Sequence, residues 1–131
     1  MDMNVRENQL SSIIYDCCYD IHSKLGPGLF ESVYERILAY ELRKHRLTVS
    51  RQTVLPVVWD GHSIDNAFKA DLVVEGLVLI ELKSVDEVAK IHFKQLHTYL
   101  KVTGLRLGIL ANFGGEKMKE GLTRVVNGLP D

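Results

Sequence analysis

The sequence predicts an α/β (α+β) fold in which helices flank one mixed sheet. Two helical patterns of apolar residues come first, and three strand-like segments follow them. A further helical pattern then separates the third strand from a fourth, which implies a crossover between parallel strands beside antiparallel neighbours. The length of 131 residues favours a single domain, and the 46% of hydrophobic residues can fill one core.

The helices at the start of the chain are predicted by apolar residues spaced three and four apart. The first pattern runs from Leu10 to Leu25, and Gly26-Pro27-Gly28 ends it. The second runs from Phe30 to Leu42 and carries basic residues at its C-terminal end, where the helix dipole favours cations. The first third of the chain is therefore expected to be a helix pair.

Three strands are predicted next. Residues 47–59 are rich in β-branched side chains and end at the turn signal Asp60-Gly61. Residues 68–74 and 77–83 are apolar runs on either side of Glu75-Gly76, a spacing typical of a tight hairpin.

The rest of the chain predicts a helix, a strand and a second helix. Helical periodicity returns from Val88 to Leu100 and stops at Gly104, and residues 106–113 form a strand. We expect a single domain over residues 1–131, composed of an N-terminal helix in 1–25, a core in 28–113 and a C-terminal helix in 116–126. The inward residues of that last helix would be Met118, Leu122, Val125 and Val126.

Charge and cysteine content exclude several classes of protein. The formal net charge of −1 gives no global positive field, so a nucleic-acid partner would need a local basic face. Cys17 and Cys18 are adjacent and cannot close a stabilising loop, which fits a reducing compartment. No apolar run reaches the ~18 residues of a membrane span. We expect a cytoplasmic protein without membrane contact.

The chemistry of the chain centres on the 68–83 hairpin. Glu81 and Lys83 are two residues apart and therefore share one face of an otherwise apolar strand, where a lone buried charge costs several kcal/mol. Asp71 stands in the neighbouring strand, and two facing acids repel unless a positive group lies between them. A divalent ion such as Mg²⁺ would satisfy both acids. The alternative is a structural ion pair between Glu81 and Lys83.

Strand register tests this arrangement. Asp71 and Glu81 share a face only if the numbers of paired residues sum to an even number, because opposed residues of an antiparallel pair lie on the same side. We therefore predict a three-residue connection, Val74-Glu75-Gly76, with Gly76 left-handed as in a type I turn with a G1 bulge, or else a bulge elsewhere in the hairpin. A regular two-residue hairpin would separate the acids.

Several other residues could join the site. Glu31 opens the second helix, where an acid also simply favours a helix N-terminus. Gln95 and Tyr99 lie one turn apart on the helix face that carries His92. The lysines on the other side of that helix, Lys90 and Lys94, could contact phosphates or belong to a solvated face.

Asp71, Glu81-x-Lys83 and the helix after them resemble the PD-(D/E)xK nuclease superfamily, whose core runs helix, three strands, helix, strand. Gly28-x-x-Glu31-x-x-Tyr34 together with Gln95, Tyr99 and Asn112-Phe113 is similar to a small bacterial and archaeal family named for its GxxExxY signature. Ala70 stands where the superfamily's name has a proline, a position that ligates nothing.

The resemblance implies a restriction-endonuclease-like core and a set of residue roles. Asp71, Glu81, Glu31 and the backbone carbonyl of Leu82 would bind Mg²⁺ or Mn²⁺, and Lys83 would be the catalytic lysine. Gln95 would also be catalytic. The substrate would be bound by Tyr99, Lys90, Lys94 and His92.

The expected function is that of a metal-dependent nuclease that hydrolyses phosphodiester bonds, with DNA preferred over RNA and with a possible homodimer. One alternative is a noncatalytic module that keeps the fold and binds nucleic acid or protein. Another is a buried ion network that only stabilises the hairpin, in which case Glu81→Ala would destabilise the fold strongly.

Overall fold

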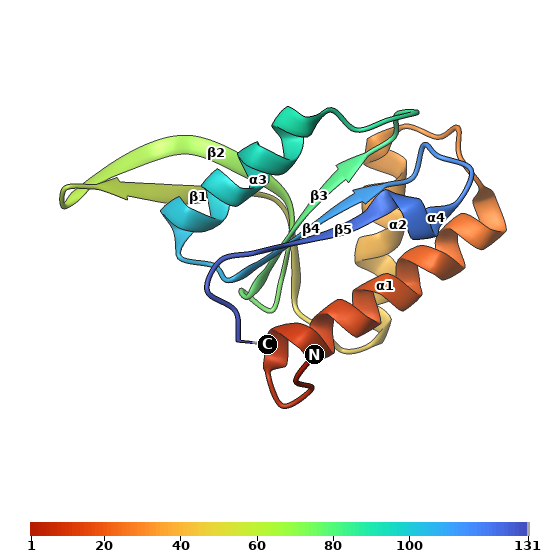
Figure 1. Ribbon diagram of the computed structural model, residues 1–131, viewed down its shortest axis with the longest axis horizontal. Helices are drawn as coiled ribbons and strands as arrows, with labels where there is room; N and C mark the ends of the chain where they lie inside the picture. Colours follow the sequence, from red (N-terminus) through yellow and green to blue (C-terminus); the bar gives the residue numbers. More distant parts are fainter. Residues whose placement is uncertain (131) are drawn as a thin grey trace.

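The computed structural model describes residues 1–130 and contains one mixed five-stranded sheet with helices on both faces (Figure 1). The parallel pair is β3–β4, and the other three neighbouring pairs are antiparallel. This confirms the predicted α+β class and the mixed sheet. The strands, which lie side by side in chain order, are β1 (Val49–Trp59), β2 (His62–Val74), β3 (Val78–Lys83), β4 (Leu107–Asn112) and β5 (Leu122–Val126).

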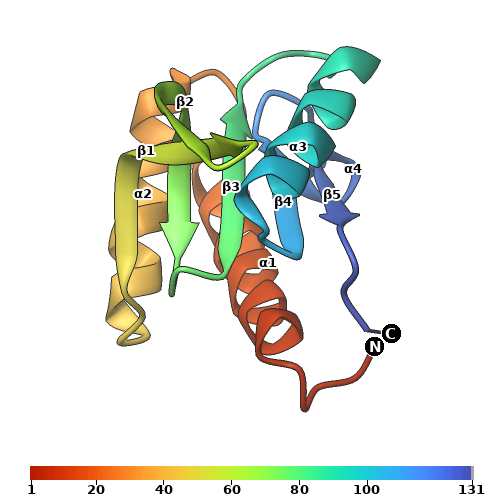
Figure 2. The same ribbon diagram turned by 90° about the vertical axis from the view of Figure 1, so that its left-hand side faces the viewer.

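Helices α1 (Arg6–Leu25) and α2 (Glu31–Lys44) cover one face of the sheet, and α3 (Lys90–Thr103) covers the other (Figures 1 and 2). Alternate residues of β3 point to the two sides, so Ile80 joins the core under α1 and α2, whereas Leu79 joins the core under α3. Because α3 connects β3 to β4, it is the predicted crossover helix, and Gly104 ends it with a φ of 78°.

The predicted C-terminal helix in 116–126 is wrong. Only the single turn α4 (Met118–Gly121) is helical, and Leu122–Val126 forms β5 against β4. The spacing of the apolar residues fits a helix, but the β-branched side chains at positions 123, 125 and 126 suit a strand, and β4 offers an unpaired edge. The chain also turns closely over β4, because a Cβ on Gly121 would lie 2.1 Å from the carbonyl oxygen of Asn112.

The turn between β2 and β3 confirms the predicted even register. Val74 pairs with Val78, and Leu72 pairs with Ile80. The residues between the last pair are 75–77, so the connection lies one residue later than predicted. Glu75 (φ 54°) and Gly76 (φ 65°) are both left-handed, so the turn is of type I′ rather than type I. Glu75 tolerates this conformation with its carboxylate held by the Thr48 N–H at 2.8 Å.

Beyond the shared sheet, β1 and β2 continue as a two-stranded arm that bends away from the other strands (Figures 1 and 2). The β2–β3 ladder stops at Leu72 and Ile80, so the earlier part of β2 has only β1 as a neighbour. At the base of the arm the ring of Phe68 stacks on Tyr99 of α3, with centroids 4.0 Å apart. Where the arm departs, the part of β2 before Leu72 is no longer paired with β3.

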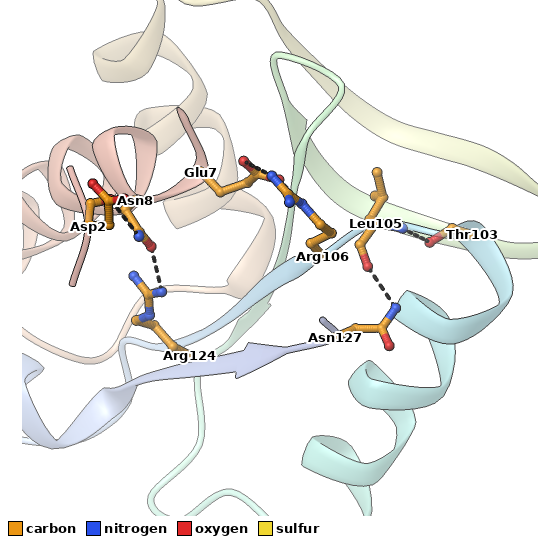
Figure 3. A network of polar contacts seen from close by, with 8 residues as sticks. All are labelled: Asp2, Glu7, Asn8, Thr103, Leu105, Arg106, Arg124 and Asn127. Carbon is orange, nitrogen blue, oxygen red and sulfur yellow. Dashed lines mark hydrogen bonds and ion pairs between the residues drawn. The ribbon is translucent and has the colours of Figure 1, made fainter. Parts of the chain in front are cut away.

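Hydrogen bonds connect the start of α1 to the β4–β5 edge of the sheet (Figure 3). The buried Glu7 carboxylate accepts hydrogen bonds from Nε and Nη2 of Arg106 at 2.7 and 2.9 Å. The side chain of Asn8 accepts one from Nη2 of Arg124 at 2.8 Å and donates another to the Asp2 carbonyl. These charged hydrogen bonds hold the first turn of the chain against residues beside β4 and within β5.

Candidate metal and phosphate site

The site begins with Asp71, at the point where β2 leaves β3. The antiparallel ladder has ended there, and the N–H of Leu82 donates at 2.8 Å to Oδ2 of Asp71. The Asp71 carboxylate therefore accepts the hydrogen bond that a backbone carbonyl of β2 would accept if the ladder continued. The register continues to bring Asp71 beside Glu81, which is the arrangement that the even register predicts.

Glu81 is a largely buried acid with an unusual proton affinity. Burial is the main cause that raises its pKa from 4.5 to about 8, and the neighbouring Asp71 carboxylate raises it further, while Lys83 acts in the opposite direction. Oε1 of Glu81 is buried and has no hydrogen-bond partner among the residues that the structure describes. Buried carboxylate oxygens are normally paired, so this one is poised to accept a proton or a cation.

A small cavity of about 170 Å³ adjoins Glu81 on the α3 side of the sheet. It brings together four residues that the sequence singled out with Glu81, namely Lys83, His92, Gln95 and Tyr99. Leu96 and Leu110 form its apolar floor, and Lys69 is a further cation in its wall. The ammonium groups of Lys69 and Lys83 and the amide of Gln95 can bind an anion such as a phosphate group. The Glu81 carboxylate can bind a metal ion that accompanies this anion.

Two residues of the cavity, His92 and Tyr99, have polar groups that are shielded from water. Nδ1 of His92 is buried and lacks a hydrogen-bond partner in the structure. Burial also raises the pKa of the Tyr99 phenol, and the nearby Glu81 adds to this effect. Stacking on Phe68 fixes the Tyr99 ring at the same time. The α3 face predicted to reach the site does so.

The structure does not bring Glu31 into the carboxylate pair. Glu31 is exposed at the first turn of α2 and lines a separate surface depression with Phe30 and Ser84. Residues 1–130 contain no group of three or more His, Cys, Asp or Glu side chains gathered closely enough to hold one metal ion. Lys90 and Lys94 are exposed on α3 and do not line the cavity.

Glu35, one turn beyond Glu31, is the acid of α2 that is linked to Asp71, through the side chain of Gln52. It is buried, and its Oε1 accepts a hydrogen bond from Nε2 of Gln52, which also donates to Oδ1 of Asp71 at 3.3 Å. Arg51 pairs with Oε2 of Glu35 at 3.0 Å. The sequence did offer one signal for Glu35, since it is an acid three residues before Leu38 on the apolar face of α2.

Gln52 and Lys69 carried no comparable signal. Both lie in the β1–β2 arm, in segments whose polar residues read as ordinary solvated strand positions. Gln52 comes close to Asp71 because the β1–β2 register places the two residues opposite each other, and Lys69 lines the same cavity as Glu81. Only the folded chain places a β1 amide and a β2 ammonium near Asp71 and Glu81.

Tyr34, a residue of the signature that lies within α2, has a structural role. The Tyr34 hydroxyl donates to the Gly26 carbonyl and accepts a hydrogen bond from the Leu29 N–H at 3.3 Å. Its ring stacks on Phe113, with centroids 4.5 Å apart. Tyr34 thereby fixes the turn between α1 and α2 to the end of β4.

The Asp71 and Glu81 carboxylates fit a divalent ion. Mg²⁺ is usually bound through one or two carboxylates, with water and substrate phosphate in the remaining positions, so a pair of acids is sufficient. The unpartnered Oε1 of Glu81 supplies an oxygen that no other group in residues 1–130 uses. Asp71 retains acceptor capacity, since each carboxylate oxygen can accept more than one contact.

Comparison with known proteins gives one family. A model of the PD-(D/E)XK nuclease superfamily matches residues 8–125, which is most of the chain and includes α2, the hairpin and α3. The searches among curated proteins and among solved structures gave no match.

Proposed function

The chain belongs to the PD-(D/E)XK nuclease superfamily, and from this premise we propose that it is a metal-dependent nuclease that hydrolyses phosphodiester bonds in DNA. Nucleases of this superfamily generally use divalent metals. The observation that carries the proposal is the buried, unpartnered oxygen of Glu81 beside a second acid, in a cavity that also holds Lys83.

In this proposal Asp71 and Glu81 hold Mg²⁺ or Mn²⁺, which when bound supplies Lewis acidity toward a phosphate oxygen. The Lys83 ammonium orients the attacking water and stabilises the negative charge that develops on the phosphate. Water adds across the P–O ester bond, and the products are one phosphate end and one hydroxyl end. Gln95 acts beside Lys83, since both line the same cavity.

The substrate is held by the α3 side of the cavity. Lys69, His92 and Tyr99 surround the space where a phosphate would meet Glu81 and Lys83. Lys90 and Lys94 extend the positive charge along the exposed side of α3 toward neighbouring phosphates. The resemblance assigns metal binding also to Glu31 and the Leu82 carbonyl. The chemistry proposed here requires only the pair Asp71 and Glu81.

Membership of the GxxExxY family, a preference for DNA over RNA, a homodimer, and a cytoplasmic location in a prokaryote all stay predictions of the sequence. None of the helices in residues 1–130 combines the length and the apolar composition that crossing a bilayer requires.

The test compares wild type with Asp71→Asn, Glu81→Gln and Lys83→Ala on labelled single- and double-stranded DNA and RNA, with Mg²⁺ or Mn²⁺. We expect each substitution to reduce cleavage by about 10²-fold or more, because each removes a charge that acts in the transition state. Lys119→Ala, which removes an exposed lysine distant in the chain from the hairpin, is the matched control and should cleave like wild type. Calorimetric titration of Mn²⁺ should show binding to wild type and not to Asp71→Asn.

Two outcomes would contradict the proposal. Absence of Mn²⁺ binding to wild type would favour the noncatalytic module. Cleavage that persists in all three variants would show that a contaminating nuclease, rather than this site, is responsible.

A further inference from the structure

Gln52 adopts a backbone conformation that strands rarely contain. Its φ is 48°, in the left-handed region, although it lies within β1. The register on either side pairs Arg51 with Leu72 and Thr53 with Ala70, so Gln52 stands opposite Asp71. Strained residues of this kind persist where the surroundings hold them, and they concentrate at functional sites.

The side chain of Gln52 connects two acids, Glu35 of α2 and Asp71 of β2. Its Nε2 donates one hydrogen bond to Oε1 of Glu35 and another, at 3.3 Å, to Oδ1 of Asp71. A primary amide has two N–H donors, so each acid receives one. Nε and Nη2 of Arg51 bind the other oxygen of Glu35 at 3.1 and 3.0 Å. The anchor of Gln52 is therefore itself held.

Asp71 is consequently oriented from two strands. Oδ2 accepts the Leu82 N–H of β3, and Oδ1 accepts the Gln52 amide of β1. With either donor missing, the carboxylate can rotate about its terminal bonds and leave the place where it faces Glu81. The backbone contact from Leu82 fixes one oxygen only, so the plane of the carboxylate depends on the second contact.

We infer that Gln52, anchored by Glu35, is the positioning residue that fixes the Asp71 carboxylate for metal binding. This inference rests on the proposed function, because such orientation matters for activity only if Asp71 binds a metal. The β1–β2 register places Gln52 opposite Asp71, and the backbone is left-handed at the same residue. Partners of this kind behind metal ligands typically change metal affinity by 10- to 100-fold when they are removed.

The test uses Gln52→Met, which keeps the length of the side chain without its donors, and Gln52→Gly, which also relieves the backbone. Gln52 is exposed, so neither change opens a cavity in the core. We expect both variants to bind Mn²⁺ 10- to 100-fold more weakly in calorimetric titrations. Asn66→Gly is the control, since Asn66 is exposed in the arm and has a similar φ of 56°, and its Mn²⁺ affinity should equal that of wild type.

A second measurement needs no metal. In the metal-free protein, hydrogen exchange of the Leu82 amide should accelerate at least tenfold in Gln52→Met, because Asp71 no longer holds it steadily, while the Leu79 amide should exchange as in wild type. Unchanged Leu82 exchange would overturn the inference whether or not metal binds. Failure of wild type to bind Mn²⁺, together with the expected acceleration of Leu82 exchange in Gln52→Met, would instead refute the proposed function. Loss of unfolding stability with unchanged Mn²⁺ affinity would reduce Gln52 to a structural role.

Discussion

Replacing Glu81 with glutamine should stabilise the metal-free protein. The pKa of Glu81 is about 8 in the folded chain, against 4.5 for an exposed glutamate. Below pH 4.5 the carboxyl is protonated in both states, and its contribution to stability is fully present. As pH rises toward 8 the unfolded chain releases the proton first, so the stability of the folded state falls.

The magnitude follows from the size of this shift. Each pH unit between 4.5 and about 8 costs roughly 1.4 kcal/mol, so at pH 7 the buried carboxyl lowers the free energy of unfolding by at most about 3.5 kcal/mol. Glutamine has nearly the same shape and no charge at any pH. The gain of Glu81→Gln over wild type should therefore be near zero at pH 4 and grow steadily up to pH 8.

The assay is urea unfolding in EDTA at several pH values, followed by far-UV circular dichroism. Trp59 fluorescence is a poor reporter, because that side chain is 75% exposed in the arm. A difference that does not vary with pH, or a Glu81→Gln protein less stable than wild type at pH 8, would refute this reasoning. That second result would favour the buried ion network, in which Glu81 and Lys83 stabilise the hairpin. In the expected case, adding Mn²⁺ at pH 8 should stabilise wild type and have little effect on the variant.

Two further predictions concern the framework around the site, and urea unfolding measures both. Arg106→Ala should lower the free energy of unfolding by about 3 kcal/mol at pH 7, because it leaves the buried Glu7 carboxylate unpaired. The hydrogen bond from Arg106 lowers the pKa of Glu7, so this loss should shrink as pH falls below 4.5, and a constant loss would contradict the pairing. Gly114→Ala should cost about 2 kcal/mol or more, since its Cβ would lie 2.2 Å from the Val85 carbonyl oxygen, whereas Gly115→Ala, with open space around the Cβ, should change stability by less than about 0.5 kcal/mol. Equal effects at the two glycines would show that the loop after β4 adjusts freely.

The C-terminal segment illustrates what periodicity leaves undecided. Leu122, Val125 and Val126 have spacings that a helix can use, and the same residues form β5 in the folded chain. The choice depends on the unpaired edge of β4, which exists only after the crossover through α3 has placed β4 beside β3. A long-range hydrogen-bond partner thus outweighed a local pattern.

The residues of the candidate site divide in the same way. Asp71, Glu81 and Lys83 could be identified from the sequence, because charges within apolar strands are costly and alternation places them on a known face. The α3 residues Gln95 and Tyr99 followed from helical spacing. The sequence alone also determined the first two helices, the crossover and the presence of the first four strands, since each depends on local patterns of apolar residues and turn signals. It placed the start of the second strand at residue 68, whereas β2 begins at His62, because residues 62–67 are mostly polar and gain their strand partner only by pairing with β1.

Tertiary structure decided which other side chains meet those acids. Glu31 and Glu35 are one turn apart on α2, and only the packing of that helix against β1 and β3 buries Glu35 and leaves Glu31 exposed. Gln52 meets Asp71 because the β1–β2 register sets the two residues opposite each other, and Lys69 lines the cavity beside Glu81 where β2 is no longer paired with β3. Local spacing fixes the face on which a side chain lies, but the distance between elements far apart in the sequence is set by how their faces pack together.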